Sequence, residues 1–129
     1  MIVERIAGDG WDKARLLFDE VPDAQQDANL EIGTPDEEGF FQGGFRDPNT
    51  GDPLEDELVD GRCIPDGLTA RIAFTRIHAG GNMTTRYVGR VIPLGNDTTV
   101  MIRGKFTRAT TSGTIVSIAS GDYETEKPT

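Results

Sequence analysis

The second half of the chain is a series of apolar, strand-forming segments separated by short turn signals. Four segments, at residues 68–77, 83–92, 98–108 and 114–127, are rich in Thr, Val, Ile, Phe or Tyr. Each is bounded by Gly, Asn, Pro or Ser. This spacing is typical of an antiparallel meander of consecutive β-strands. In a chain of 129 residues, such a meander either closes into a small barrel or folds as a sandwich.

Side chains alternate within these segments in a way that predicts one buried and one exposed face. Val100, Ile102, Gly104 and Phe106 share one face of their segment, and the residues between them share the other. Together with shorter strands in the first half, we expect about eight strands, which is the number that closes a barrel around side chains or one small ligand. The sequence therefore predicts an all-β fold, an antiparallel eight-stranded up-and-down barrel.

The first 35 residues are the uncertain entry segment of this single domain, which spans residues 1–129 with the barrel core at 36–127. Apolar residues between Trp11 and Val21 recur every three to four positions, as in an amphipathic helix. The run at 14–21 also has the length of a strand. We favour the strand, because a meander needs an entry strand, and keep the helix as the alternative.

Turn signals fix several boundaries between the expected strands. Gly43 and Gly44 lie inside an aromatic run and predict a bulge or bend, as a barrel corner requires. Gly67 follows Pro and Asp and is expected to adopt positive φ in a tight turn. Residues 93–97 have the composition of a hairpin turn, and residues 22–28 that of a polar loop or a single helical turn.

The protein is acidic, with a net charge of -9, and its charge is unevenly distributed. Residues 1–60 hold 17 of the 22 acidic residues and 4 of the 13 basic ones. Strands of opposite sign could pair within one domain, which we favour, or the acidic half could form a contact face for a partner. Nucleic acid is not expected as a partner, because phosphate contacts need clustered Lys and Arg.

We expect a cytoplasmic location, because signals for targeting to a membrane or for secretion are not found in the sequence. We find no apolar run of about 18 residues that would span a membrane. The N-terminus lacks the apolar core and cleavage site of a signal peptide. Cys63 is the single cysteine, so no internal disulfide can form, and we expect it to be a small buried residue.

Motifs for common reaction chemistry are missing from the sequence. His78 is the only histidine, so no metal-ligand set, cofactor site or serine nucleophile with a base is expected. We expect His78 to be exposed or structural. The acidic turn at residues 47–57 lacks the spacing of a calcium loop.

Aromatic residues that could face a barrel interior are the remaining site candidates. Tyr87 is the candidate catalytic residue, because its hydroxyl could orient or activate a carbonyl by hydrogen bonding. These side chains could simply fill the core, which we favour, or they could line a ligand cavity. The candidate ligand-binding residues are Trp11, Phe41, Phe45, Phe74, Met101 and Phe106.

Two segments resemble the small eight-stranded barrels of the allene-oxide-cyclase and dirigent type. They are FRDPNTGDPLEDELVDGRCI at residues 45–64 and GTIVSIASGDYE at residues 113–124. A second resemblance, to the calycin-like avidin-type barrels, is carried by GFFQGGF, DGRCI, TTRYVG and GDYETEKP, in this order. The tryptophan cluster that grips biotin in avidins has no counterpart, because Trp11 is the only tryptophan.

The first resemblance includes small polyketide cyclases that form spirocycles by [4+2] addition, as Diels-Alderases. It implies a cofactor-independent cyclase that holds an apolar substrate in a closed cavity, where orientation alone accelerates the reaction. On this basis we expect a homodimeric barrel that binds an apolar small molecule and cyclises it. The alternatives are a carrier that leaves its ligand unchanged, or a non-catalytic interaction module such as a virion or complex subunit.

Overall fold

The structure, a computed structural model, describes residues 2–95 and 98–128. Within these residues one short 3-10 helix precedes ten β-strands, and no helix is long and apolar enough to cross a lipid bilayer. In chain order the elements are η1 (Ile2–Ile6), β1 (Asp12–Phe18), β2 (Gln25–Gln26), β3 (Asn29–Ile32), β4 (Phe40–Phe41), β5 (Gly43–Arg46), β6 (Glu57–Asp66), β7 (Thr69–Ile77), β8 (Met83–Leu94), β9 (Thr99–Ser112) and β10 (Ile115–Pro128).

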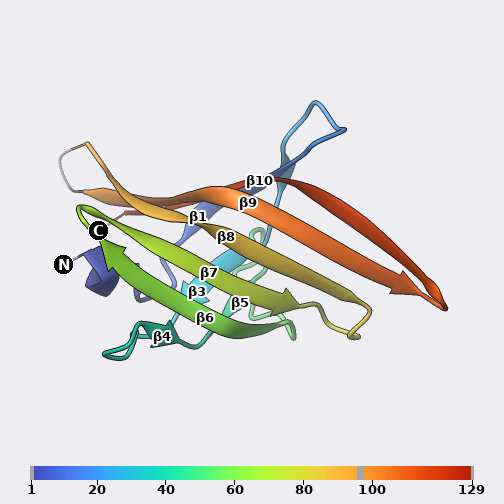
Figure 1. The fold of residues 1–129 in the computed structure, drawn as a ribbon, viewed down its shortest axis with the longest axis horizontal. Helices are drawn as coiled ribbons and strands as arrows, with labels where there is room; N and C mark the ends of the chain where they lie inside the picture. The colour runs from blue at the N-terminus through green and yellow to red at the C-terminus, as the bar shows by residue number, and fades with distance from the viewer. Residues whose placement is uncertain (1, 96–97, 129) are drawn as a thin grey trace.

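Eight of these strands form one antiparallel sheet in the order β2-β1-β10-β9-β8-β7-β6-β4 (Figure 1). Strands β7 to β10 form the predicted meander, and β6 extends it by one further antiparallel hairpin with β7. The first long strand pairs with the last one, through Arg15 opposite Glu124 and Phe18 opposite Gly121. This pairing joins the two ends of the chain and curls the sheet, which confirms the all-β, eight-stranded antiparallel class.

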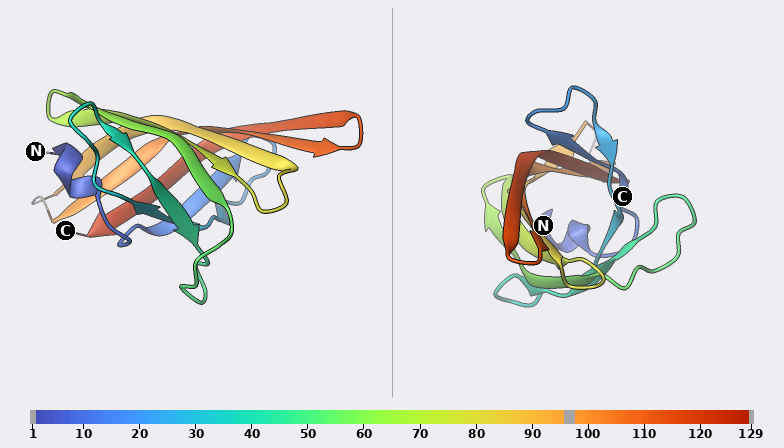
Figure 2. Two further views of the ribbon diagram at one scale, coloured as in Figure 1. Left: turned by 90° about the horizontal axis from the view of Figure 1, so that it is seen from below. Right: turned by 90° about the vertical axis from the view of Figure 1, so that its right-hand side faces the viewer.

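A separate two-stranded sheet, β3 with β5, lies between the two edges of the curled sheet. The backbone N–H of Asp27, just before β3, donates to the carbonyl of Ala14 in β1 over 2.8 Å. On the other side, Gly33 donates to the carbonyl of Gln42, between β4 and β5, over 2.6 Å. Viewed from the end, the strands surround a common interior (Figure 2).

The predicted alternation is confirmed in the long strands. In β7, Ala70, Ile72 and Phe74 are buried on the inner face, and in β9, Val100 and Ile102 are buried. They belong to one core that also contains residues of β1, β3 and β10. Period-two patterning thus places the same face of every strand toward the barrel interior.

The entry segment forms a strand, as favoured, and the helical alternative for it was wrong. Trp11, directly before β1, is buried, and its indole Nε1 donates to the carbonyl of Ile6 over 2.9 Å. Ile6 belongs to η1, which was not predicted and which covers the end of the barrel at the chain termini (Figure 1). The segment expected to be a polar loop or helical turn contains the short strand β2.

The glycine signals have clear structural counterparts. The aromatic run is interrupted at Gln42, between β4 and β5, and Gly43 is the first residue of β5. A Cβ atom on Gly43 would lie 2.0 Å from the carbonyl oxygen of Glu31. Gly67 has a φ of 66°, as its turn requires. The predicted turn at residues 93–97 falls partly on residues 96 and 97, which lie outside the described part of the chain.

Ion pairs join the two halves of the chain. In some of them the basic residue comes from the second half, and in others it comes from the first half. Arg76, from the basic half, pairs with Asp27 and Asp56 of the acidic half. In the opposite sense, Arg15 pairs with Glu124, and Lys13 lies 3.5 Å from Glu126. The expected pairing of opposite charges is therefore concentrated at Arg76.

Candidate functional site

Strand register places two rows of inward side chains next to each other across β7, β8 and β9. Tyr87 lies opposite Phe74 on one side and Phe106 on the other, and we call these three residues the ring row. Thr85 lies opposite Arg76 and Arg108 in the same way, and these three form the polar row. The polar row is the one nearer the β7–β8 turn, at the barrel end opposite η1.

Arg76 is the centre of a buried ion-pair network. Its Nη1 lies 2.9 Å from Oδ1 of Asp27, and its Nε lies 2.6 Å from Oδ2 of Asp56. The three side chains are only 7–9% exposed. The guanidinium also lies over the ring of Phe45, 4.9 Å from its centroid. Burial lowers the pKa of Arg76, but the neighbouring Tyr87 and Asp27 outweigh burial and raise it, so the group stays charged.

Tyr87 uses its hydroxyl inside this network. It donates to Oδ2 of Asp27 over 3.0 Å. Its ring is stacked on Phe74, with centroids 4.7 Å apart, and lies 4.6 Å from the ring of Tyr123. Burial, and then the charge of Asp27, raise the pKa of Tyr87 well above its usual range. The phenol is therefore a neutral hydrogen-bond donor with a fixed partner.

His78 and Arg108 converge on the buried hydroxyl of Thr85. Arg108 Nε donates to Thr85 Oγ1 over 2.9 Å, and His78 Nε2 lies 2.8 Å from the same oxygen. Because Thr85 accepts from Arg108, we assign its own proton to the bond with His78. Burial, followed by the charges of Arg76 and Arg108, lowers the pKa of His78 to about 4. The imidazole is therefore neutral at pH 7.

Asp56 links His78 to Arg76. Its Oδ2 lies 3.7 Å from His78 Nδ1, and its Oδ1 accepts from the backbone N–H of Ala79 over 3.0 Å. Burial favours the protonated acid, but the N–H of Ala79 and the hydrogen bond from Arg76 outweigh it and lower the pKa of Asp56. Two arginines and two aspartates thus balance, and the site has no net charge.

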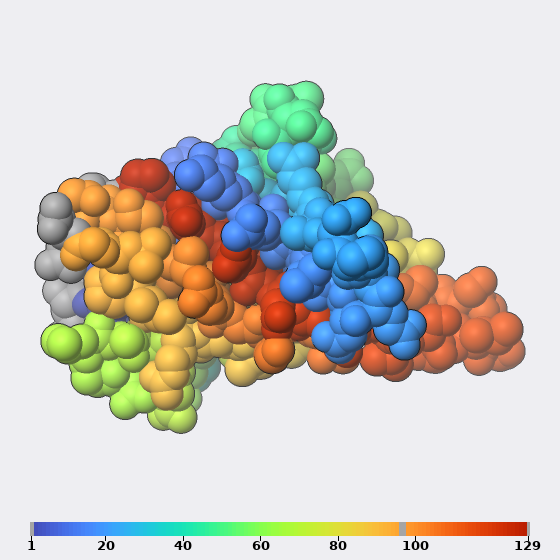
Figure 3. All heavy atoms as spheres, turned by 90° about the horizontal axis from the view of Figure 1, so that it is seen from above, coloured from blue at the N-terminus to red at the C-terminus, as the bar shows by residue number. Residues whose placement is uncertain are grey.

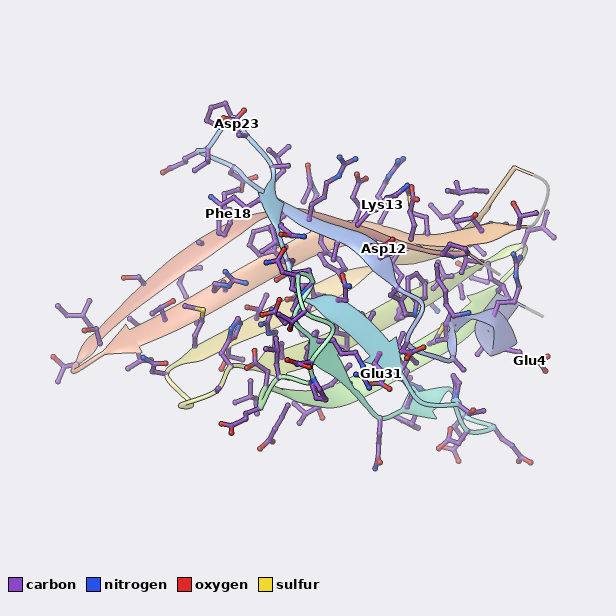
Figure 4. All side chains as sticks on the ribbon, turned by 180° about the vertical axis from the view of Figure 1, so that it is seen from behind. Glu4, Asp12, Lys13, Phe18, Asp23 and Glu31 are labelled. Carbon is purple, nitrogen blue, oxygen red and sulfur yellow. The ribbon has the colours of Figure 1, made fainter. Side chains whose placement is uncertain are left out.

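Some of the aromatic residues proposed from the sequence as ligand-binding candidates contact one another in the structure. Phe41 and Phe45 each lie 6.4 Å from Phe74, centroid to centroid, so they join the ring row from the opposite wall. Phe106 is in edge contact with Phe18 at 5.0 Å. Phe18 ends β1, where the chain turns into the loop that carries Asp23 (Figure 4). These rings contact one another, which is the core-filling arrangement.

Two other candidates lie apart from this group. Trp11 is at the η1 end, bonded to Ile6. Met101 is buried on the opposite face of β9 from Phe106, beside a groove that Lys13 and Gln25 also line. Their roles in ligand binding stay predictions, as does that of Tyr87. Arg103 and Asp122 are not part of the interior, since their side chains are 64% and 53% exposed.

Sequence reasoning missed most of the polar network. Arg76 and Arg108 each lie two residues after an inward phenylalanine, and extending the alternation by one step would have placed both inside. Thr85 lies two residues before Tyr87, so alternation places it on the same face, but nothing in the sequence marks it as a site residue. Asp27 and Asp56 are in loops before β3 and β6, where no periodic pattern indicates which way a side chain points.

A groove lies on the outer surface of the barrel, away from the polar row. It has a volume of about 440 Å³ and lies between β1 and the loop after it, with Leu17 and Ala24, and strands β9 and β10. The same loop covers β9 and β10 in Figure 3. Arg103, Lys105 and Asp122 line its other side. In residues 2–95 and 98–128, no group of three or more His, Cys, Asp and Glu side chains is arranged to hold a metal ion.

Comparison with known proteins identifies the architecture. No family model and no curated protein matches the sequence. Among solved structures, rhizavidin in complex with biotin superposes with a TM-score of 0.61 at 18% identity, over 94% of this chain and 99% of that chain. The fold is that of the avidin-type barrels. Apo shwanavidin matches with a TM-score of 0.52 at 11% identity, over 94% of this chain and 95% of its own.

A second crystal form of apo shwanavidin agrees, with a TM-score of 0.52 at 14% identity over 92% of this chain and 96% of that one. The resemblance to allene-oxide-cyclase and dirigent barrels was therefore wrong. The residues that carried it, such as the turn at Asn49–Gly51 and the glycine at 113, are those that most antiparallel hairpins need. They indicate hairpins without distinguishing one barrel from another.

Proposed function

We propose that this chain binds a small, uncharged polar molecule at the barrel end where the polar row lies. The observation that carries the proposal is the buried network around Arg76, in which Asp27, Asp56 and Thr85 are all shielded from solvent. Burying two carboxylates and a guanidinium costs several kcal/mol per ion before pairing. Apolar residues would close the same end at less cost, so the network favours a role in recognition.

The position of the network supports binding at this end. The η1 helix, with Ile6 completely buried, covers the opposite end. At the polar row, His78 and Arg108 are only partly buried and form its solvent-facing rim. Small-molecule sites commonly lie in the mouths of β-barrels, with a few convergent polar groups on apolar walls. Rhizavidin shares the fold over nearly its full length, and the matched structure is its complex with biotin.

The chemistry of the network specifies a ligand class. Arg108 can donate hydrogen bonds through its remaining N–H groups, and Asp56 can accept them. A ligand that replaces the bond between Thr85 and His78 would find a donor in the Thr85 hydroxyl and an acceptor in His78 Nε2. Because the network has no net charge, an ionic head would be poorly matched. A urea or amide group, which offers a carbonyl acceptor beside N–H donors, fits this pattern. Biotin carries such a cyclic urea, and 2-imidazolidinone is that cyclic urea alone, without the fused sulfur ring and the acid tail of biotin.

The packed interior does not favour cyclisation of a substrate. Catalysis by orientation needs an enclosed apolar chamber, whereas Phe74, Tyr87 and Tyr123 are packed ring against ring. The Tyr87 hydroxyl would also have to leave Asp27 before it could orient a substrate. Equal conversion of a linear precursor by the wild type and by Tyr87→Phe would remove this residue from any such mechanism.

Two matched arginine variants test the site. Titration calorimetry with biotin and with 2-imidazolidinone should show binding by the wild type. Arg108→Met should weaken it about tenfold or more, since a lost bond from a charged donor is worth about 1.5–3 kcal/mol. Arg103→Met is the control on the same strand, because Arg103 points outward and lines the outer groove.

The effects of the two variants distinguish the possible sites, and binding that neither variant weakens also overturns the proposed site. Binding that is weakened by Arg108→Met alone supports the polar row. Binding that is weakened by Arg103→Met alone places the ligand in the outer groove and overturns the proposed site. If neither probe binds at millimolar concentration, the urea and amide class is wrong.

A further inference from the structure

The β9–β10 hairpin extends past the rest of the barrel as a two-stranded arm (Figure 1, Figure 2). Its strands remain paired to the tip, where Ile115 lies opposite Ser112. On the β9 side, β8 accompanies the arm up to Met83 opposite Thr110. On the β10 side, β1 stops at Phe18 opposite Gly121. One edge of β10 therefore continues without a neighbouring strand in the described chain.

The side chains of this arm differ from the rest of the surface. Residues 109–121 contain no charged residue, although charged residues make up 27% of the chain. Ile115, Val116 and Ile118 are 67%, 59% and 65% exposed. Natural sheet edges are usually protected from pairing by charge, proline or a bulge. The segment from Ile115 to Ala119 has none of these, and its pairing with β9 is regular.

The backbone direction along the free edge follows from one hydrogen bond. The carbonyl of Ser120 accepts from the N–H of Asp19, on the β1 side of β10. In an antiparallel ladder, both polar groups of a residue point to the same side and successive residues alternate. The N–H and C=O groups of Val116 and Ile118 therefore point outward at the open edge, and those of Ser117 point toward β9.

We infer that this edge pairs with the same edge of a second copy of the chain, antiparallel and across a two-fold axis at Ser117. In this register Val116 of each copy lies opposite Ile118 of the other, and these are the residues whose backbone groups point outward. About four hydrogen bonds would form between them. The apolar side chains of Val116 and Ile118 meet on one face, and Ile115 lies opposite Ala119 on the other.

Charge favours a second copy as the occupant. Two molecules that each carry a net charge of -9 repel one another over most of their surfaces. The uncharged arm is where they can approach with the least opposition. Its neutral Ser, Thr, Val and Ile side chains cannot form ion pairs with a charged partner. They can pack against the same neutral side chains of a second copy. An isologous contact of this kind is closed, so it stops at the dimer.

The dimer should be weak. Stable interfaces use about 20–30 residues on each side, whereas this edge supplies the five residues from Ile115 to Ala119. Sedimentation velocity should therefore show a monomer at low micromolar concentration and an increasing dimer fraction toward about 1 mM. Ile118→Pro removes an outward N–H without touching the pairing with β9, and it should abolish the dimer.

A charge-matched pair separates edge pairing from general repulsion. Ile118→Lys and Leu68→Lys each add one positive charge at an exposed apolar residue, but Leu68 lies in the β6–β7 turn, 87% exposed. Ile118→Lys should reduce the dimer at least tenfold, and Leu68→Lys should not. A wild type that stays monomeric at 1 mM, or equal effects of the two lysines, would overturn the inference. Circular dichroism and Trp11 fluorescence confirm that each variant is folded.

Cross-linking tests the register itself. At the two-fold axis, the Ser117 residues of two copies form a non-hydrogen-bonded pair, with Cα atoms about 4.5 Å apart. That distance is within the range of a disulfide. Ser117→Cys should therefore cross-link into dimers under mild oxidation, much faster than Ser112→Cys on the other strand of the arm. The buried Cys63 does not interfere. Equal rates for the two cysteines would exclude the proposed register.

Discussion

The hydroxyl of Tyr87 and the carboxylate of Asp27 are joined by a 3.0 Å hydrogen bond inside the barrel, between residues 60 positions apart in the chain. Asp27 also pairs with Arg76, so it holds β7 and β8 to the segment that precedes β3. Asp27→Ala would leave a buried guanidinium with one partner fewer. We expect it to lower the free energy of unfolding by about 3–5 kcal/mol, measured by urea denaturation.

Tyr87→Phe is the matched comparison for this network. It removes one hydrogen bond to a charged acceptor but leaves the ion pair and the ring stacking in place, so the loss should be about 1.5–3 kcal/mol. Combining both changes should cost less than the sum of the two, because they share one bond. A strictly additive double variant, or an Asp27→Ala variant as stable as the wild type, would contradict the proposed network.

His78 should make stability depend on pH between 4 and 6.5. Its pKa is lowered from 6.5 to about 4 in the folded protein, so the unfolded chain binds the proton first. The stabilisation is therefore complete above pH 6.5 and is lost as the pH falls toward 4. We expect the free energy of unfolding at pH 5 to be about 1–2 kcal/mol lower than at pH 7, allowing for solvent screening of the partly exposed ring.

The control for this pH dependence is His78→Gln, which keeps a polar side chain but does not titrate. It should flatten the pH profile between 5 and 7. Because the chain has one histidine, its NMR signals also report the pKa directly. A measured pKa near 6.5 would mean that the imidazole is not buried beside Arg76 and Arg108.

Two glycines should respond differently to replacement by alanine. Gly104 lies opposite Gly89 across β8 and β9, and a Cβ on it would be 2.1 Å from the carbonyl oxygen of Val88. Gly104→Ala should therefore destabilise the protein by about 1–3 kcal/mol. At Gly44 in β5, nothing lies within 4 Å of a Cβ. Gly44→Ala should be neutral or stabilising by up to about 1 kcal/mol, through the unfolded chain.

Thermal and urea unfolding of both alanine variants measure this difference. Equal destabilisation by the two would mean that the close approach of β8 and β9 at Gly104 does not decide the outcome. The close approach has a structural use, since Tyr123 lies opposite Gly104 and its ring reaches Tyr87. Glycine at positions 89 and 104 leaves the interior free for these two rings.

Cys63 should be chemically protected in the folded state. Its side chain is fully buried, and burial raises the pKa of its thiol to about 11. Since the thiolate is the reactive form, a thiol reagent should modify the folded protein at least about 100-fold more slowly than the urea-unfolded chain. Rapid modification of the native protein would indicate that β6 opens readily next to its short edge neighbour β4.

Local sequence was sufficient to identify the four long strands β7 to β10, but not the short strand β2. Period-two alternation depends only on neighbouring residues, so the inner faces of β7 and β9 and the turn at Gly67 could be predicted without knowledge of the fold. The same alternation, extended by one step, places Arg76 and Arg108 inside. It could not distinguish one antiparallel barrel from another, because all of them use the same hairpins and turn residues.

Contacts between residues far apart in the chain could be identified only from the tertiary structure. The closure of β1 on β10 joins Arg15 to Glu124, which are 109 residues apart, and no local pattern encodes such a contact. The approach of Asp27 to Arg76, across 49 residues, depends on that closure. Whether the phenylalanines enclose a cavity or touch also depends on how the two walls pack. Side-chain periodicity specifies which residues face inward, and packing decides what they meet there.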